Sequence, residues 1–136
     1  MAGAAPPPDE TGIVTKHSPR SVAETVSRLT KLLATRGIKV FAVIDQRAEA
    51  IRAGLELRET VLVIFGNPAQ GTPVMAAAPL AGLDLPLKVL IWADGEQTAV
   101  SYYAPETLAA RHHLSPDLTQ RLAGINAITD ALVAAE

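Results

Sequence analysis

Hydrophobic positions recur along this chain with a helical period in some stretches and a strand period in others. Between Val22 and Leu33 the main apolar positions are three or four residues apart, which is the spacing of one helix face. Ser21 and Glu24 match the S-x-x-E capping box that begins many helices. Gly37 follows as a stop signal, so this segment predicts an amphipathic helix.

Short runs of β-branched and aliphatic residues predict strands. The run Thr60–Phe65 is almost entirely apolar, which favours a central strand covered on both faces, or covered by protein on one face and by a partner on the other. Between the last two runs, Asp94-Gly95 favours a tight type I′ hairpin turn. The predicted strands are Thr11–His17, Ile38–Asp45, Thr60–Phe65, Leu87–Ala93 and Thr98–Tyr103.

A short helix is predicted directly after the second strand, over Gln46–Gly54. Ala48, Ile51 and Leu55 lie at helical spacing in and just after it, so we expect these side chains to face the core. Gly54 is suited to end the helix, because glycine adopts the conformation that commonly follows a last helical turn.

Proline positions predict where the remaining helices begin. Thr72-Pro73 has the form of an N-cap followed by a proline at the first helical position, which predicts a helix through Ala78 and an ordered loop over residues 79–86. Pro105 predicts a helix to His112. Ser115-Pro116 predicts one final helix, whose buried stripe consists of Leu118, Leu122, Ile125 and Leu132.

The order of these elements indicates a single α+β domain over residues 11–136. Only the first crossover has the form of a β-α-β unit, and the other connections suit a mainly antiparallel sheet with helices packed on one face. The other face must be solvated, covered by short helices or used in a dimer. The first ten residues, MAGAAPPPDE, predict a disordered, extended tail over residues 1–10.

Composition narrows the classes of function. The chain of 136 residues is 49% hydrophobic but only 4% aromatic, so its core must be aliphatic. Cysteine is absent, which excludes thiol catalysis, cysteine-ligated zinc and disulfides. A net charge of −2 with scattered cations argues against nucleic-acid binding. No apolar run reaches the ~18 residues of a membrane span, so we expect no membrane partner and a cytoplasmic location.

Familiar catalytic and ligand-binding motifs fail at their decisive positions. The segment Gly66–Thr72 has the glycine spacing of a phosphate-binding loop, but Thr72 and Pro73 stand where that loop needs lysine and a hydroxyl residue. His112 and His113 are adjacent, so on a helix they diverge by about 100°. No serine lies in a G-x-S-x-G motif. We therefore expect no metal site and no cofactor, and we leave catalytic residues unassigned.

Several segments taken together resemble the uncharacterised bacterial and archaeal family called "domain of unknown function 302". The resemblance spans residues 12–133, and it implies a β-α-β(4)-α fold like that of the TATA-box-binding protein, without implying DNA binding. It also implies a compact, often dimeric protein. Many members have a histidine where this chain has Gln46, directly after Asp45. The segments that carry the resemblance are VIFGNP at residues 63–68, GTP at 71–73, LDLPLKVL at 83–90, Trp92, SY at 101–102 and LAARH at 108–112.

Three functional hypotheses follow. The leading one is a non-catalytic protein, forming a homodimer, that binds a small, partly apolar ligand between the sheet and its helices. One alternative is an enzyme with Asp45 or Asp84 as general base, and the other is a dimeric interaction module without a ligand. Tyr102 and Tyr103 must point to opposite faces of their strand, so one of them lies outside the core. The candidate ligand-binding residues are Asp45, Gln46, Asn67, Met75, Trp92 and Tyr103.

Overall fold

The structure is a computed structural model that describes residues 6–135. Residues 1–5 of the predicted tail therefore lie outside the described residues. Near the other end of that segment, the Asp9 carboxylate accepts hydrogen bonds from the backbone N–H groups of Thr11 and Ile13, at 2.8 and 3.0 Å. These contacts form a local turn that leads into the first strand.

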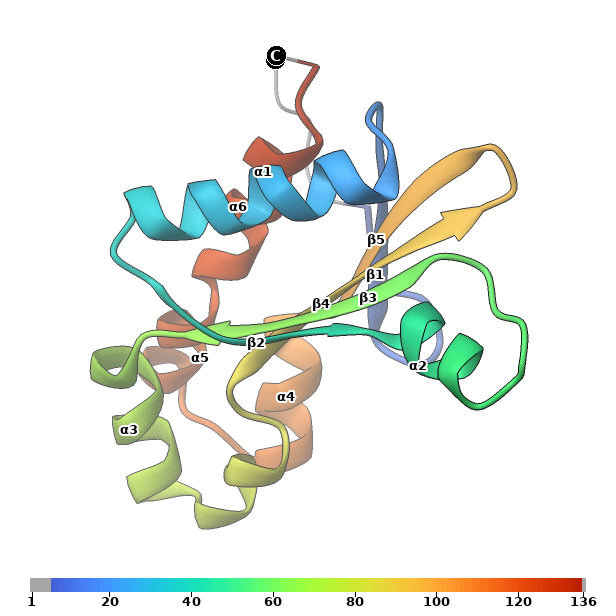
Figure 1. Ribbon diagram of the computed structural model, residues 1–136. Coiled ribbons are helices and arrows are strands. Elements are labelled where there is room, and N and C mark those ends of the chain that lie inside the picture. Colours follow the sequence, from blue (N-terminus) through green and yellow to red (C-terminus); the bar gives the residue numbers. More distant parts are fainter. Residues whose placement is uncertain (1–5, 136) are drawn as a thin grey trace.

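Five strands and six α-helices, with one short 3₁₀ helix, make up the described residues (Figure 1). The strands are β1 (Ile13–Ser18), β2 (Lys39–Asp45), β3 (Thr60–Gly66), β4 (Leu87–Asp94) and β5 (Gln97–Tyr103). The helices are α1 (Val22–Thr35), α2 (Gln46–Arg52), α3 (Pro68–Ala77), the 3₁₀ helix η1 (Pro79–Leu83), α4 (Pro105–His112), α5 (Pro116–Leu122) and α6 (Gly124–Val133).

The strands form one antiparallel sheet in the order β1-β5-β4-β3-β2. The α1 crossover therefore carries the chain from one edge of the sheet to the other, and β2 to β5 then return strand by strand. This is the predicted α+β architecture and the β-α-β(4)-α order. Thr60–Phe65 lies in an inner strand, as predicted, with Val61, Val63 and Phe65 buried on one face while its other face is only half-buried.

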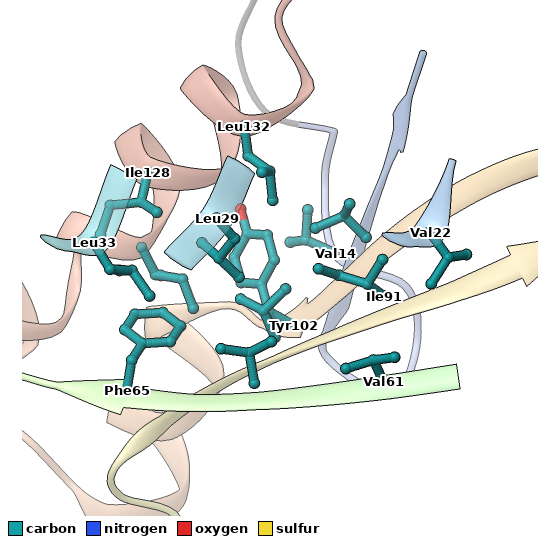
Figure 2. Close-up of a cluster of buried hydrophobic side chains, with 14 of the residues drawn as sticks. Val14, Val22, Leu29, Leu33, Val61, Phe65, Ile91, Tyr102, Ile128 and Leu132 are labelled. Carbon is teal, nitrogen blue, oxygen red and sulfur yellow. The ribbon is translucent and has the colours of Figure 1, made fainter. Parts of the chain in front are cut away.

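The main core lies between the sheet and the two long helices α1 and α6, which cover one face (Figures 1 and 2). Leu29 and Leu33 from α1 and Leu132 from α6 are fully buried there, against Phe65 and Tyr102 from the sheet. Burying a side chain of this size contributes about 1.5–3 kcal/mol each, so this layer supplies most of the driving force. The core is aliphatic, as the composition requires.

A second, smaller cluster gathers where the short helices meet. Val74 of α3, Ala81 of η1, Leu108 of α4 and Leu122 of α5 are buried together with Leu85. Figure 1 shows α3, η1 and α4 on the side of the sheet opposite α1 and α6. The second sheet face is thus flanked by short helices rather than covered by a full helical layer.

The capping prediction for the first helix is confirmed. Ser21 accepts a hydrogen bond from the Glu24 backbone N–H, and the Glu24 carboxylate accepts one from the Ser21 N–H. These reciprocal bonds satisfy donors that a helix start leaves unpaired.

The prediction that α2 packs inward is wrong. Ile51 is 59% exposed and Leu55 is 65% exposed, and α2 has no buried residue. The helix directly follows the edge strand β2 and contacts β3, while the long helices α1 and α6 lie on the opposite side of the sheet (Figure 1), so Ile51 and Leu55 stay exposed. Helical spacing indicates a shared face, but only the tertiary arrangement decides whether that face is covered.

The helix predicted to begin at Thr72-Pro73 begins earlier. Asn67 is its N-cap, with its side chain accepting from the Ala69 N–H, and Pro68 occupies the first helical position. Pro73 consequently lies inside α3. Two N-cap and proline pairs compete in this segment, and the earlier pair starts the helix.

The predicted hairpin forms, but its turn is shifted by one residue. Asp94 pairs with Gln97 in the ladder, so the two turn residues are Gly95 and Glu96. Only Gly95 has a positive φ, +62°, which matches a type II′ turn rather than type I′.

The predicted final helix is two helices. The helix is interrupted between Leu122, which ends α5, and Gly124, which begins α6. Leu122, Ile125 and Leu132 are buried as predicted, but Leu122 belongs to the small cluster while Ile125 and Leu132 belong to the main core. Because the helix is interrupted, the apolar side chains of α5 pack into the small cluster and those of α6 pack into the main core.

Candidate functional site

The predicted ligand-binding residues do not meet in one place. Asp45 and Gln46 lie at the start of α2, where the Asp45 carboxylate caps the helix by accepting from the Ala48 N–H at 2.9 Å. Asn67 and Met75 line a small cavity beside α3. Trp92 and Tyr103 lie on the half-exposed face of the sheet. The six residues therefore lie as pairs in three separate regions of the fold.

The cavity beside α3 encloses about 190 Å³ and has mainly apolar walls. The side-chain oxygen of Asn67 is occupied in capping the helix, which leaves its amide NH2 group as the free polar part. The Arg121 guanidinium lines it from α5 and bonds to the Gln70 side chain at 3.2 Å and to the Ala69 carbonyl at 3.5 Å. A proline at position i deprives the carbonyl at i−4 of its helical donor, so Pro73 leaves the Ala69 carbonyl open for Arg121.

A larger cavity of about 360 Å³ lies on the second face of the sheet. Its floor comes from β3, β4 and β5, and its walls come from the segment after η1 and from α4. Its polar lining includes a lysine and a carboxylate, Lys88 and Asp84, whereas the cavity beside α3 has no acidic lining residue. Its lining residues are Ile13, Leu62, Leu83, Asp84, Leu87, Lys88, Leu90, Ser101, Tyr102, Tyr103, Leu108 and Ile125.

Lys88 places an amine in this cavity. It lies in an inner strand, and its Nζ donates hydrogen bonds to the backbone carbonyls of Asp84 and Pro86, each at 3.0 Å. Partial burial lowers the pKa of Lys88, and the negative charge of Asp84 opposes that effect. These bonds also hold the Asp84–Pro86 segment against the sheet, where the Leu85–Pro86 peptide is cis.

The Asp84 carboxylate is directed toward α4. Its Oδ2 atom lies 2.6 Å from Nε2 of His112 and 2.9 Å from a guanidinium nitrogen of Arg111. Partial burial alone would raise the pKa of Asp84, but the hydrogen bonds from His112 and Arg111 outweigh it, so the pKa lies below the ordinary value of 3.8. Asp84 is therefore a weak base whose charge holds the end of α4 to the η1 segment.

Aromatic side chains border the same region. Tyr103 is 45% exposed and stacks with the Arg111 guanidinium, 5.3 Å from its ring centre, whereas Tyr102 is buried on the other face. One tyrosine thus lies outside the core, as predicted. Trp92 donates from Nε1 to the Ser101 hydroxyl at 3.0 Å, and Ser101 also bonds to Thr15 at 2.8 Å. Trp92 is the single tryptophan of the chain and contacts a lining residue of the cavity.

Sequence reasoning missed Lys88, Arg111 and His112. Lys88 is an ordinary lysine within a strand pattern, and Arg111 and His112 end a short helix 27 and 28 residues after Asp84. No local spacing links such distant positions. The one available signal was that LDLPLKVL and LAARH both belong to the segments that carry the family resemblance.

The other polar features are simpler. Among residues 6–135 no group of three or more His, Asp or Glu side chains is placed to hold a metal ion. None of the helices in that range is long and apolar enough to cross a membrane. His17 lies on the cavity's side of β1 but 3.6 Å from Asp94 at the hairpin end.

The family follows from comparison with known proteins. The model for "Domain of unknown function DUF302" matches residues 14–132. The chain belongs to the DUF302 family. The match includes the complete sheet apart from Ile13, together with the segments that form the walls of the sheet-face cavity.

A solved DUF302 structure has the same fold. It is the crystal structure of an uncharacterized conserved DUF302 protein from Bacillus stearothermophilus, with a TM-score of 0.76 at 22% identity. The similarity covers 90% of this chain and 95% of that one. At this identity the match establishes the architecture alone.

Curated relatives at higher identity are longer proteins. This chain is 42% identical over 106 residues to "Fluoride-specific ion channel FluC 1" of Brucella suis biovar 1 (strain 1330) and of Brucella abortus biovar 1 (strain 9-941). The aligned region covers 77% of this chain but only 42% and 39% of those proteins. The chain thus spans about two fifths of the length of the relatives it matches.

Proposed function

We propose that this DUF302 protein binds a small, partly apolar molecule in the sheet-face cavity and does not catalyse a reaction on it. The observation that carries the proposal is a cavity of about 360 Å³ with leucine-rich walls and a small set of convergent polar groups, Lys88, Ser101 and Tyr103. This combination is typical of small-molecule sites, where apolar area supplies affinity and a few polar groups fix orientation.

Catalysis by a carboxylate base has less support. A general base works best when its pKa lies near the working pH. The pKa of Asp84 is lowered, and its Oδ2 atom already accepts from Arg111 and His112. Asp45 is exposed and caps α2. Both carboxylates thus have structural tasks that suit them poorly for accepting a substrate proton.

The proposal includes a homodimer. Apolar side chains at the β2 edge and around α2 are left open in one copy of the chain, and clusters of this kind mark interaction surfaces. A second copy using the same surface would cover them symmetrically. The residues concerned, each at least 36% exposed, are Phe41, Val43, Ile44, Ile51, Leu55 and Leu57.

Fluoride conduction is not part of the proposal. That activity is named for relatives of which the aligned region covers 42% or less, so it belongs to proteins much longer than the matched segment. Binding of a small molecule is proposed from the cavity of this chain alone.

The deciding experiment is native mass spectrometry of the protein purified from its own host. We expect a mass increment for a retained small molecule, lost on denaturation. Leu62→Phe adds bulk inside the sheet-face cavity and should abolish the increment. Thr72→Leu adds bulk beside the α3 cavity and should leave it unchanged.

The opposite result is equally informative. A folded dimer that never carries a small molecule would refute ligand binding and favour the dimeric interaction module. A monomer at micromolar concentration that still carries the molecule would refute only the dimer. Val43→Glu, at the exposed edge strand, should dissociate the dimer without changing ligand content.

A further inference from the structure

We propose that the ligand of the sheet-face cavity is an amphipathic organic anion, whose charged group binds Lys88 and whose apolar body lies on the leucine-lined floor. This inference rests on the proposed binding function and specifies the chemical class of the ligand.

A lysine ammonium has three N–H donors in fixed tetrahedral directions. In Lys88 two of them bind the carbonyl oxygens of Asp84 and Pro86. Among residues 6–135 Lys88 has no other hydrogen-bond partner, and it lines the cavity. The two carbonyls fix Nζ in position, so the third donor is pre-oriented for an acceptor brought by a ligand.

The charge balance around Lys88 favours an anion as that acceptor. The nearest carboxylate, Asp84, uses Oδ2 to bind Arg111 and His112 and forms no direct ion pair with Lys88. Arg111 does not line the cavity itself, but it stacks on Tyr103, which does, so a second cation lies just outside the lining. With one carboxylate, Asp84, against the two basic side chains Lys88 and Arg111, the charge in and beside the cavity is positive on balance.

The rest of the wall requires an apolar body. Leu62 and Leu90 form the floor, with Leu83 and Ile13 at its margins. A simple inorganic anion would leave this apolar surface in contact with water. A neutral apolar molecule would displace water from the third N–H donor of Lys88 and offer no acceptor in its place. A molecule with both an anionic group and an apolar body provides the acceptor for Lys88 and covers the leucine side chains.

The test uses two dyes that share one aromatic frame. 1-Anilinonaphthalene-8-sulfonate carries a sulfonate, and N-phenyl-1-naphthylamine lacks it. Each is titrated into the protein, with dye fluorescence and quenching of Trp92 as paired readouts. Because Trp92 is the only tryptophan and bonds to Ser101 of the cavity, its quenching reports binding there.

We expect the wild type to bind the sulfonate dye more tightly than its neutral counterpart. Lys88→Met should weaken the sulfonate dye by about tenfold or more, the value of one hydrogen bond to a charged group. It should change the neutral dye less than about threefold. Lys88→Arg should restore the preference for the anion, and Lys31→Met, on the exposed side of α1, should change neither dye.

Circular dichroism confirms that each variant is folded. Equal weakening of both dyes in Lys88→Met, without rescue by Lys88→Arg, would show that Lys88 only supports the cavity wall, and would overturn the proposal. Equal affinity of the wild type for both dyes would also overturn it while leaving apolar ligand binding intact. If neither dye quenches Trp92, the binding function itself fails.

Discussion

At the scale of single residues, Asp84 shows how one carboxylate couples two parts of the chain. Its lowered pKa arises because His112 and Arg111 stabilise the charged form more than partial burial disfavours it. A group whose folded-state pKa is depressed stabilises the fold above its unfolded pKa and loses that effect as the pH falls through the folded pKa. The Asp84 contribution is therefore fully present at neutral pH and declines as the pH falls from about 3.8, the ordinary pKa of the group, through the lower pKa of the folded state.

This sign gives a prediction for Asp84→Asn. At pH 7 the variant should be less stable by about 1–2 kcal/mol, because two hydrogen bonds to a charged acceptor are weakened. The difference should shrink as the pH falls below 3.8. Urea unfolding between pH 3 and pH 7 measures it, with Glu56→Gln in an exposed loop as control. A deficit that stays constant down to pH 3 would contradict this account.

Lys16 is a second residue whose role the sequence does not reveal. It is only 6% exposed, and its Nζ donates to the Thr129 hydroxyl at 2.6 Å and to the Asp130 carboxylate at 2.8 Å. The ammonium also lies over the Tyr102 ring, 5.2 Å from its centre. A buried cation of this kind is tolerated only because its donors are matched.

Thr129→Val should therefore cost about 1–3 kcal/mol, since it removes an acceptor from the Lys16 ammonium at almost constant volume. In a Lys16→Met background the same change should cost distinctly less, because no buried cation is left unsatisfied. A double-mutant cycle of urea unfolding free energies checks this coupling. Equal costs in the two backgrounds would show that Thr129 acts through its bonds within α6 instead.

At the scale of elements, α3 has a well-capped N-terminus but contains a proline, Pro73, in its interior. Its start satisfies the rules for an N-cap and an N1 proline, at Asn67 and Pro68. Pro73 then interrupts the hydrogen bonding of the helix, and Arg121 of α5 bonds to the carbonyl that loses its donor. The same defect lies beside the smaller cavity, so it helps to shape that wall.

Pro73→Ala should consequently stabilise the protein relative to Pro116→Ala, by about 1–3 kcal/mol. Both changes remove a ring and free the unfolded chain equally. Pro116 occupies the first turn of α5, where a missing N–H costs nothing, so it is a matched control. Thermal and urea unfolding of the two variants provide the comparison, and a less stable Pro73→Ala would show that packing of the proline ring outweighs the restored bond.

At the scale of the whole molecule, stability is distributed unevenly across the sheet. β4 is the middle strand, paired with β3 over Leu87–Trp92 and with β5 over Leu90–Asp94, so every residue of it has a neighbouring strand on at least one side. The edge strand β2 has three apolar residues that are at least 36% exposed, and α2 beside it has no buried residue. Side chains between the sheet, α1 and α6 are thus tightly buried, whereas those at the β2 edge and on α2 are largely exposed (Figure 1).

Hydrogen exchange should follow this gradient. We expect the amides of β4 to exchange slowest, near the global free energy of unfolding, and those of α2 to exchange faster than those of any other helix of seven residues or more. Mass spectrometry of labelled fragments measures both. Slow exchange in α2 at high protein concentration that becomes fast on dilution would support the homodimer, whereas slow exchange at all concentrations would contradict the open edge.

The sequence by itself determined most of the secondary structure, because local rules decide it. The Ser21–Glu24 capping box, the prolines at helix starts and the alternation of the strands each act within a few residues, and they predicted the α+β order correctly. Where two local signals competed, as at Asn67-Pro68 and Thr72-Pro73, the pattern alone chose the wrong one.

Tertiary structure decided which faces are covered and which polar groups meet. The exposure of Ile51, the division of the last helix between two clusters and the contact of Asp84 with His112 all depend on positions far apart in the chain. The spacing of hydrophobic residues indicates that one face of a helix is apolar. Whether that face is buried depends on which other element packs against it, and the spacing does not specify that element. For the same reason the candidate site, with Lys88 at its centre, exists only once the sheet has brought its strands together.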